Sequence, residues 1–175
     1  MKINNGKASA SLLIKMLAER PNLIPVWDLD GVLVDASHRI RLKPCGALDL
    51  EHYRQNTTAA QVALDQSLPL LRVVHWLNEQ QRPYYVATAR VACEHTRNML
   101  INKQIKPLGI MARLGHEDRR GDAVLKADHF MAGFTPEQRA SLILIDDLPS
   151  NCEGARACGM LSVQVVTDYG SVLMR

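Results

Sequence analysis

Two carboxylates stand at the end of an apolar segment, in the stretch VWDLDG of residues 26–31. Side chains alternate along an extended chain, so Asp28 and Asp30 are expected on the same face, and Gly31 allows a sharp turn directly after them. The flanking apolar residues favour a strand buried on both faces, as in a parallel sheet covered by helices. Two acids there need a cation, so the pattern indicates a phosphoryl-transfer site. The alternative is a surface turn, in which Asp and Gly are also common.

Further polar residues follow later apolar segments of the chain. Thr88 and the pair Asp146 and Asp147 each come directly after an apolar run, and Lys126 lies between them in sequence. In an open α/β sheet the ligand binds beyond the carboxyl ends of the strands. We therefore expect these four side chains to converge with the first two acids at one edge of the sheet.

The order of these motifs resembles the haloacid dehalogenase superfamily of phosphatases, over roughly residues 23 to 168. A βαβ rhythm along the chain favours a doubly wound, three-layer sandwich. The resemblance implies the same α/β class, a Rossmann-like α/β/α fold whose parallel sheet has about five strands in the order 5-4-1-2-3. It also implies a phosphoric monoester hydrolase.

The chemistry of such an enzyme assigns a role to each motif. Asp28 is the expected nucleophile, which forms an aspartyl-phosphate, and Asp30 is the expected general acid and base. Thr88 would donate its hydroxyl to the transferring phosphoryl group, and Lys126 would act as a point charge against that group and Asp28. For Lys126 the alternative is an ordinary exposed lysine on a helix.

A hard cation is expected at the site, because a phosphate dianion would otherwise be repelled by the aspartates. Carboxylate oxygens favour Mg²⁺. The family resemblance implies as ligands the carboxylate of Asp28, the backbone carbonyl of Asp30 and one of Asp146 and Asp147, with the other reaching the metal through water. The four cysteines show no paired-ligand spacing, so neither zinc nor a disulfide framework is expected and a reducing, cytoplasmic location is the default.

Several arginines extend the resemblance to the phosphatase half of phage polynucleotide kinase/phosphatase. Arg39 lies eleven residues after the first aspartate, Arg90 follows Thr88 by two, and Arg120 and Asp122 precede the lysine. The resemblance implies that these residues hold a nucleotide 3′-phosphate or order the site, and Arg113 is a further match with different spacing. No Gly-x-x-x-x-Gly-Lys-Ser/Thr loop occurs, so no kinase domain is expected.

The chain is expected to form a single domain over residues 1–175, without a membrane-spanning segment. An insert after the first strand, over about 36–66, is too short for a large cap, and its part from Leu48 to Gln66 is expected to be partly helical. A short helix should begin at Thr135 and a later one should stop at Gly159. Strands are predicted over 23–29, 84–88, 108–112, 142–146 and 161–166, and helices over about 68–81, 92–104, 121–131 and 150–158.

Three functions remain open from the sequence. The preferred one is a Mg²⁺-dependent phosphatase of nucleic-acid 3′-phosphate ends or nucleotides. The second is a small-molecule phosphatase such as a 5′(3′)-nucleotidase, for which a helical insert closing over the cleft would be the supporting observation. The third is a binding module that keeps the fold without turnover. The net charge of +3 is too small to identify a polyanionic partner, and the oligomeric state is not predicted.

Overall fold

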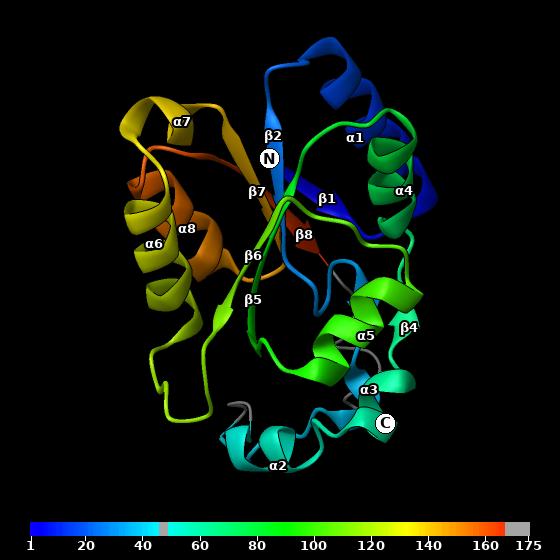
Figure 1. The fold of residues 1–175 in the computed structure, drawn as a ribbon, viewed down its shortest axis with the longest axis vertical. Helices are drawn as coiled ribbons and strands as arrows, with labels where there is room; N and C mark the ends of the chain where they lie inside the picture. The colour runs from blue at the N-terminus through cyan, green and yellow to red at the C-terminus, as the bar shows by residue number, and fades with distance from the viewer. Residues whose placement is uncertain (46–48, 167–175) are drawn as a thin grey trace.

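A six-stranded parallel sheet forms the centre of the computed structural model, which describes residues 1–45 and 49–166 (Figure 1). Each neighbouring pair of strands is parallel. In spatial order the strands are β1 (Lys2–Asn4), β8 (Leu161–Val166), β7 (Leu142–Asp146), β2 (Ile24–Trp27), β5 (Tyr85–Val91) and β6 (Gly109–Arg113). The five predicted strands thus occur in the predicted order 5-4-1-2-3. The sequence did not indicate β1, which is added at the edge beside β8.

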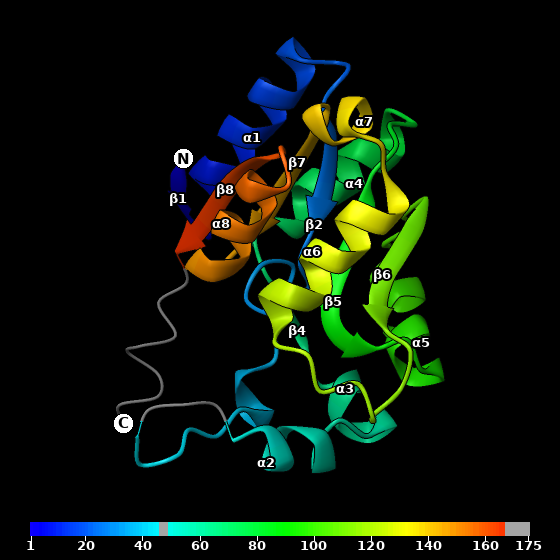
Figure 2. The same cartoon turned by 90° about the vertical axis from the view of Figure 1, so that its left-hand side faces the viewer.

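Helices cover both faces of the sheet, which confirms the predicted three-layer α/β/α fold (Figures 1 and 2). One layer contains α1 (Lys7–Glu19), α4 (Leu71–Glu79) and α5 (Glu94–Asn102). The other contains α6 (Asp122–Gly133), α7 (Pro136–Ala140) and α8 (Pro149–Ala157). Both layers place helix termini near the end of the sheet where the polar motifs lie.

Local sequence explains two of the predicted helix boundaries. Thr135 begins α7 with a reciprocal capping box, in which its hydroxyl accepts from the Gln138 backbone and the Gln138 side chain accepts from the Thr135 backbone. After α8 the chain turns at Gly159 with φ of +84°, a conformation in which a side chain would be strained. Each signal is local in sequence, which is why both could be predicted.

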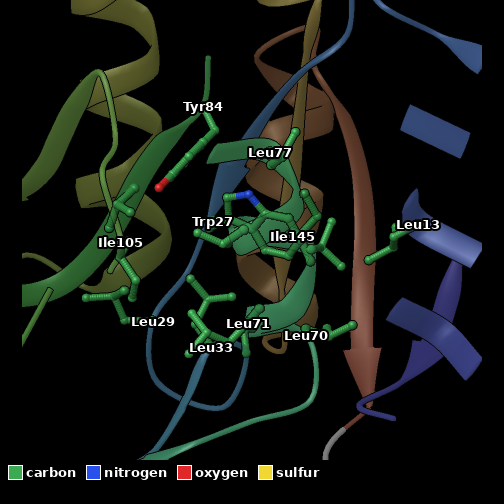
Figure 3. Packing of buried hydrophobic residues seen from close by; sticks show 14 of the residues in the cluster. Leu13, Trp27, Leu29, Leu33, Leu70, Leu71, Leu77, Tyr84, Ile105 and Ile145 are labelled. Atoms are coloured by element: carbon green, nitrogen blue, oxygen red, sulfur yellow. The ribbon is translucent and has the colours of Figure 1, made fainter. Parts of the chain in front are cut away.

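The core consists of two apolar layers, one on each side of the sheet, because β2 is buried on both faces, as predicted. Trp27 lies on the side of α1 and α4, in the same apolar cluster as Leu13 and Leu77 (Figure 3). Its neighbour Val26 belongs to the opposite cluster with Phe130 of α6. Because side chains point alternately to the two faces of a strand, successive residues of β2 lie in different apolar layers. This packing on both faces fixes the position of the carboxyl end of β2, from which the first acidic motif extends.

A small helical insert follows β2, as predicted, and lies beyond the carboxyl ends of the central strands (Figures 1 and 2). A two-stranded antiparallel hairpin of β3 (Val34–Asp35) and β4 (Gln66–Ser67) closes its base. Between these strands lie the 3₁₀ turn η1 (Ser37–Arg39) and the helices α2 (Leu50–Gln55) and α3 (Ala59–Ala63). Leu48, the predicted start of the helical part, lies outside the described residues.

Strand β5 extends further than predicted. It continues to Val91 instead of ending at residue 88, because its last residue pairs with Arg113 after an irregularity in the register beyond Ala87. Arg90 therefore lies within the strand and not after it, together with Thr88, which was predicted as its last residue. In the two described ranges no helix is long and apolar enough to cross a membrane.

Candidate active site

The first acidic motif forms a tight loop at the end of β2. The Asp28 backbone N–H donates to the Ile145 carbonyl at 3.0 Å, which continues the pairing of β2 with β7 by one residue. Gly31 then adopts a φ of +80°, and its N–H donates to the Val34 carbonyl at 2.9 Å. A residue with a Cβ would be strained at this φ, so the glycine permits the turn that follows both acids. Because β2 already ends at Trp27, the two acids lie in the loop and not on one face of an extended strand as expected, and they have different partners, Lys126 for Asp28 and Arg90 for Asp30.

Lys126 links the first acidic motif to the last one. Its Nζ donates to Asp28 Oδ1 at 3.0 Å and to Asp146 Oδ2 at 2.7 Å, and all three side chains are buried. Burial works to lower the pKa of Lys126, but Asp28 and Asp146 outweigh it and raise that pKa, so the lysine is charged. Burial raises the pKa of Asp28 well above its ordinary value, against the opposing effect of Lys126. The ammonium group of Lys126 thus pairs with two buried carboxylates, those of Asp28 and Asp146.

An acidic cluster lies beside this lysine. Asp28, Asp146 and Asp147 each offer one carboxylate oxygen, and these atoms lie within 4.8 Å of one another. Burial, and next the charge of Asp146, raises the pKa of Asp147 to about 7. A hard divalent cation would remove this penalty and finds oxygen ligands here, so the donor set fits Mg²⁺.

Two further side chains hold the last acidic motif in place. Asn151, in the first turn of α8, donates from Nδ2 to Asp146 Oδ1 at 3.0 Å and to Asp122 Oδ2 at 2.9 Å. The same oxygen of Asp122 lies 3.4 Å from Lys126 Nζ. Asp122, predicted as a substrate-site residue, therefore contacts the lysine and the asparagine. Sequence reasoning missed Asn151, whose only signal is a polar residue one helical turn after the acidic pair.

Asp30 lies in a separate, positively charged environment. Arg90 donates to it from Nε at 3.0 Å to Oδ2 and from Nη2 to Oδ1, and Tyr53 of the insert donates to Oδ2 at 2.9 Å. Arg39 Nη2 approaches Oδ1 at 3.5 Å. Burial works to raise the pKa of Asp30, but Arg90 and then Arg39 outweigh it and lower that pKa to about 2. Asp30 is therefore ionised in this state of the protein.

The two arginines are held in turn by an acid of the insert. Asp65 accepts from Arg39 Nε and Nη2, both at 3.0 Å, and from Arg90 Nη2. Arg39 also donates to the Thr57 hydroxyl at 3.1 Å. Sequence reasoning singled out neither Asp65 nor Tyr53, since no motif marks them and the insert folds back over more than twenty residues to reach Asp30.

The remaining predicted residues are Thr88, Arg113 and Arg120, whose polar contacts are with other partners than the acidic cluster. The Thr88 hydroxyl is buried in β5 and accepts from the Arg90 backbone N–H at 3.2 Å. Arg113 donates to the Ala89 carbonyl at 2.8 Å and to the Asp118 carbonyl at 3.1 Å. Arg120 bonds to Asp118 and, at 2.6 Å, to Asp128 of α6. The structure thus brings Arg39 and Arg90 to Asp30, while Arg113 and Arg120 are engaged with carbonyls and acids of a neighbouring loop and helix.

Sequence comparison gives one family match. Residues 16–113, more than half of the chain, match the model of a family described as bacteriophage T5 5′-deoxynucleotidase. The matched range includes the first acidic motif, the insert, Arg90 and β6. A search among curated proteins found no match.

Comparison with solved structures shows the haloacid dehalogenase fold. A haloacid dehalogenase-like hydrolase from Streptococcus pneumoniae is 20% identical with a TM-score of 0.59, over 82% of this chain and 85% of that one. A protein from Clostridium acetobutylicum, named as a predicted phosphatase, is 13% identical with a TM-score of 0.63, over 82% and 84%. The Pnkp1/Rnl/Hen1 complex contains a chain that is 20% identical with a TM-score of 0.60. The match to that complex covers 83% of this chain but only 46% of the other.

Proposed function

The chain belongs to the bacteriophage T5 5′-deoxynucleotidase family and is a phosphoric monoester hydrolase with the haloacid dehalogenase fold, and from this we propose that it hydrolyses deoxynucleoside 5′-monophosphates in a Mg²⁺-dependent reaction. The observation that carries the choice of substrate is the insert. Its Tyr53 hydroxyl reaches Asp30 at 2.9 Å, so α2 lies against the proposed acid. An acid covered by the insert in this way suits a mononucleotide better than the end of a long nucleic acid.

In the proposed first step, an Asp28 carboxylate oxygen attacks phosphorus and the bond from phosphorus to the nucleoside oxygen breaks. The electron pair of that bond stays on the leaving oxygen, which takes a proton from Asp30. In the second step Asp30 takes a proton from the attacking water, and the aspartyl-phosphate is hydrolysed to inorganic phosphate. Lys126, 3.0 Å from Asp28 Oδ1, orients the nucleophile and stabilises charge on the phosphoryl group.

Asp28, Asp146 and Asp147 would hold the Mg²⁺ ion. When bound, the ion offsets the repulsion between these carboxylates and the phosphate dianion. The support for this assignment is the clustering of three oxygen ligands with pKa values raised by burial and mutual repulsion at Asp28 and Asp147. We also propose the Asp30 backbone carbonyl as a ligand of the Mg²⁺ ion, because the family resemblance implies it.

Asp30 must be protonated to act as an acid, yet its two arginine neighbours and Tyr53 hold it ionised. An incoming phosphate dianion brings negative charge close to Asp30, and like charges disfavour ionisation. The dianion also competes for the donors of Arg90 and Arg39. We infer that substrate binding itself raises the pKa of Asp30 and so prepares it for proton transfer.

Hydrolysis of nucleic-acid 3′-phosphate ends is the second candidate. It is supported by the spacing of Arg39, Arg90, Asp122 and Lys126 and by the fold shared with the Pnkp1 complex. The contacts of Arg113 and Arg120 weigh against it, because both side chains already bond to Asp118. They therefore offer fewer donors to a nucleic-acid backbone than the sequence suggests.

A substrate panel tests the proposal. Purified protein is assayed for phosphate release from deoxynucleoside and ribonucleoside 5′-monophosphates, nucleoside 3′-monophosphates, and oligonucleotides phosphorylated at either end. We expect the highest kcat/KM with a deoxynucleoside 5′-monophosphate, loss of activity after chelation and recovery with Mg²⁺. Preferential hydrolysis of 3′-phosphorylated oligonucleotides would establish the second candidate instead.

The nucleophile is tested separately with Asp28→Asn. The amide is nearly isosteric but cannot form the acyl phosphate, so the variant should fold and show no turnover on any substrate of the panel. Turnover equal to that of the wild type by a folded Asp28→Asn protein would exclude the covalent mechanism.

A further inference from the structure

Asp65 is a fully buried acid that the proposed mechanism does not use. Only 3% of its surface is exposed, and it lies between α3 and β4, in the last part of the insert. An unpaired carboxylate in such a position would be strongly destabilising. The buried Asp65 carboxylate is therefore tolerated because it pairs with the neighbouring arginines.

Both arginines that pair with Asp65 also reach Asp30. Arg39 presents Nε and Nη2 to the two oxygens of Asp65, the parallel geometry in which guanidinium and carboxylate fit best. Arg90 uses Nη2 toward both acids and Nε toward Asp30 alone. Two buried positive charges thus lie between two negative ones, and the group is neutral as a whole.

The backbone fixes Asp65 relative to the loop that carries Asp30. Its N–H donates to the Val62 carbonyl at 3.2 Å, and the next residue, Gln66, pairs with Asp35 in the β3–β4 hairpin. Strand β3 directly follows the glycine turn after Asp30, and Asp30 itself forms a β-bridge to Val34. Asp65 and Asp30 are therefore held at opposite sides of the same pair of arginines by the same short hairpin.

We propose that Asp65 is a positioning residue for proton transfer: it fixes the Arg39 and Arg90 side chains, and through them the orientation of the Asp30 carboxylate toward the leaving oxygen. This inference deepens the proposed function and rests on it. Asp65 makes no contact with Asp28 or Lys126 among the described interactions, so it acts on the acid and not on the nucleophile.

The dependence on the leaving group distinguishes positioning from a purely structural role. A nucleoside alkoxide needs a proton as it departs, whereas nitrophenolate departs from a nitrophenyl phosphate without one. A misplaced Asp30 should therefore slow the first step with a nucleotide and spare the first step with the aryl phosphate. A general loss of folded structure would lower both rates by the same factor.

The experiment measures the first turnover by rapid mixing, as nucleoside release from a deoxynucleoside 5′-monophosphate and as nitrophenolate release from 4-nitrophenyl phosphate. General acid catalysis contributes about 10²- to 10⁴-fold, so we expect Asp65→Asn to slow nucleoside release about tenfold or more and nitrophenolate release less than about threefold. The matched control is Asp49→Asn, also in the insert and paired with Arg41 at 2.7 Å but without contact to Asp30. It should change neither rate.

Asp65→Glu keeps the charge and extends the side chain by one methylene group, so it serves if Asp65→Asn does not fold. It should show the same selective loss on the nucleotide, because the paired geometry with Arg39 is displaced. Equal losses on the two substrates, or no loss on the nucleotide, would overturn the inference. The wild-type protein reports on the proposed function independently. If it prefers a 3′-phosphorylated oligonucleotide, the same comparison is made with that substrate, whose leaving group is also an alkoxide.

Discussion

At the scale of single residues, the site consists of two charge clusters, one with excess negative charge and one that is neutral. In the first cluster Lys126 pairs with Asp28, Asp122 and Asp146, and Asp147 lies beside them, so among the described residues the negative charges outnumber the positive one. Around Asp30, two arginines face two acids and the charges balance. The first cluster offers three carboxylate oxygens to a cation, whereas in the second cluster Nη1 of Arg90 is buried without a hydrogen-bond partner.

Replacement of Lys126 by methionine should destabilise the protein strongly in the absence of metal. The substitution keeps the length of the side chain but removes the partner of the two buried acids, and breaking such a pair costs about 3–5 kcal/mol. Urea unfolding in the presence of a chelator measures the free energy of unfolding. Lys15→Met, which removes an exposed partner of Glu19, should leave it near the wild-type value. A Lys126→Met protein as stable as this control would contradict the structural role of the charge.

Arg90→Lys should lower the activity markedly at unchanged net charge. Arg90 donates to Asp30 from Nε and Nη2 and to Asp65 from Nη2, and a single ammonium group cannot occupy the positions of both nitrogens. We expect kcat on a deoxynucleoside monophosphate to fall by about tenfold or more, because the acid is no longer held correctly. Arg72→Lys, an exposed position on α4, is the control and should retain wild-type activity.

At the scale of elements, the first strand and the insert complete a site whose motifs lie elsewhere. Asn5, which follows β1, donates from Nδ2 to the carbonyls of Gly31 at 3.1 Å and Val32 at 2.9 Å. Its Oδ1 accepts from the Leu70 N–H at 3.3 Å, just before α4. One side chain thus joins the edge strand, the glycine turn and the start of a helix.

Asn5→Ala should loosen this turn. Three polar backbone groups would lose their partner, and an unsatisfied buried group costs about 1–3 kcal/mol, so we expect a decrease of that size in the free energy of unfolding together with reduced activity. Asn98→Ala, at an exposed position of α5 where alanine favours the helix, should be neutral or slightly stabilising. Unchanged stability and activity in Asn5→Ala would show that the turn needs no support from β1.

Features marked by a sequence motif could be predicted, whereas contacts between residues far apart in the chain that no motif marks could not. The cap at Thr135 depends on a pattern of a few residues and was predictable from it, whereas the order of the five central strands was predicted through the family resemblance that the motifs carry. Asn5, Asp65 and Tyr53 reach their partners across 23 to 65 residues, and no motif marks them. Strand β1 is only three residues long and takes part in the sheet because β8 offers a free edge. The predicted catalytic roles themselves await the experiments described above.

At the scale of the whole molecule, the sheet gathers like charges at one end, and this links stability to pH and metal. The Asp28 cluster joins an acid at the end of β2 to the acidic pair at the end of β7, far away in sequence, so folding adds the repulsion between Asp28 and this pair and buries all three. The folded pKa of Asp147 is about 7, above the ordinary value for aspartate, and that of Asp28 is raised as well. The folded protein therefore binds protons that the unfolded chain has already released.

The stability of the metal-free protein should consequently fall as the pH rises from 5.5 to 8. In this window the unfolded chain has ionised aspartates, whereas folded Asp147 loses its proton and its ionisation is disfavoured, so deprotonation weakens the fold. Asp30, with a folded pKa of about 2, is ionised in both states and contributes nothing to the change of stability with pH in this window.

Mg²⁺ binds the ionised carboxylates, so it should raise Tm more at pH 8 than at pH 5.5. Calorimetry with chelator or Mg²⁺ measures both effects, and Asp147→Asn should flatten the pH dependence in chelator. A Mg²⁺-induced increase in Tm that is the same at both pH values would contradict metal binding by this acidic cluster.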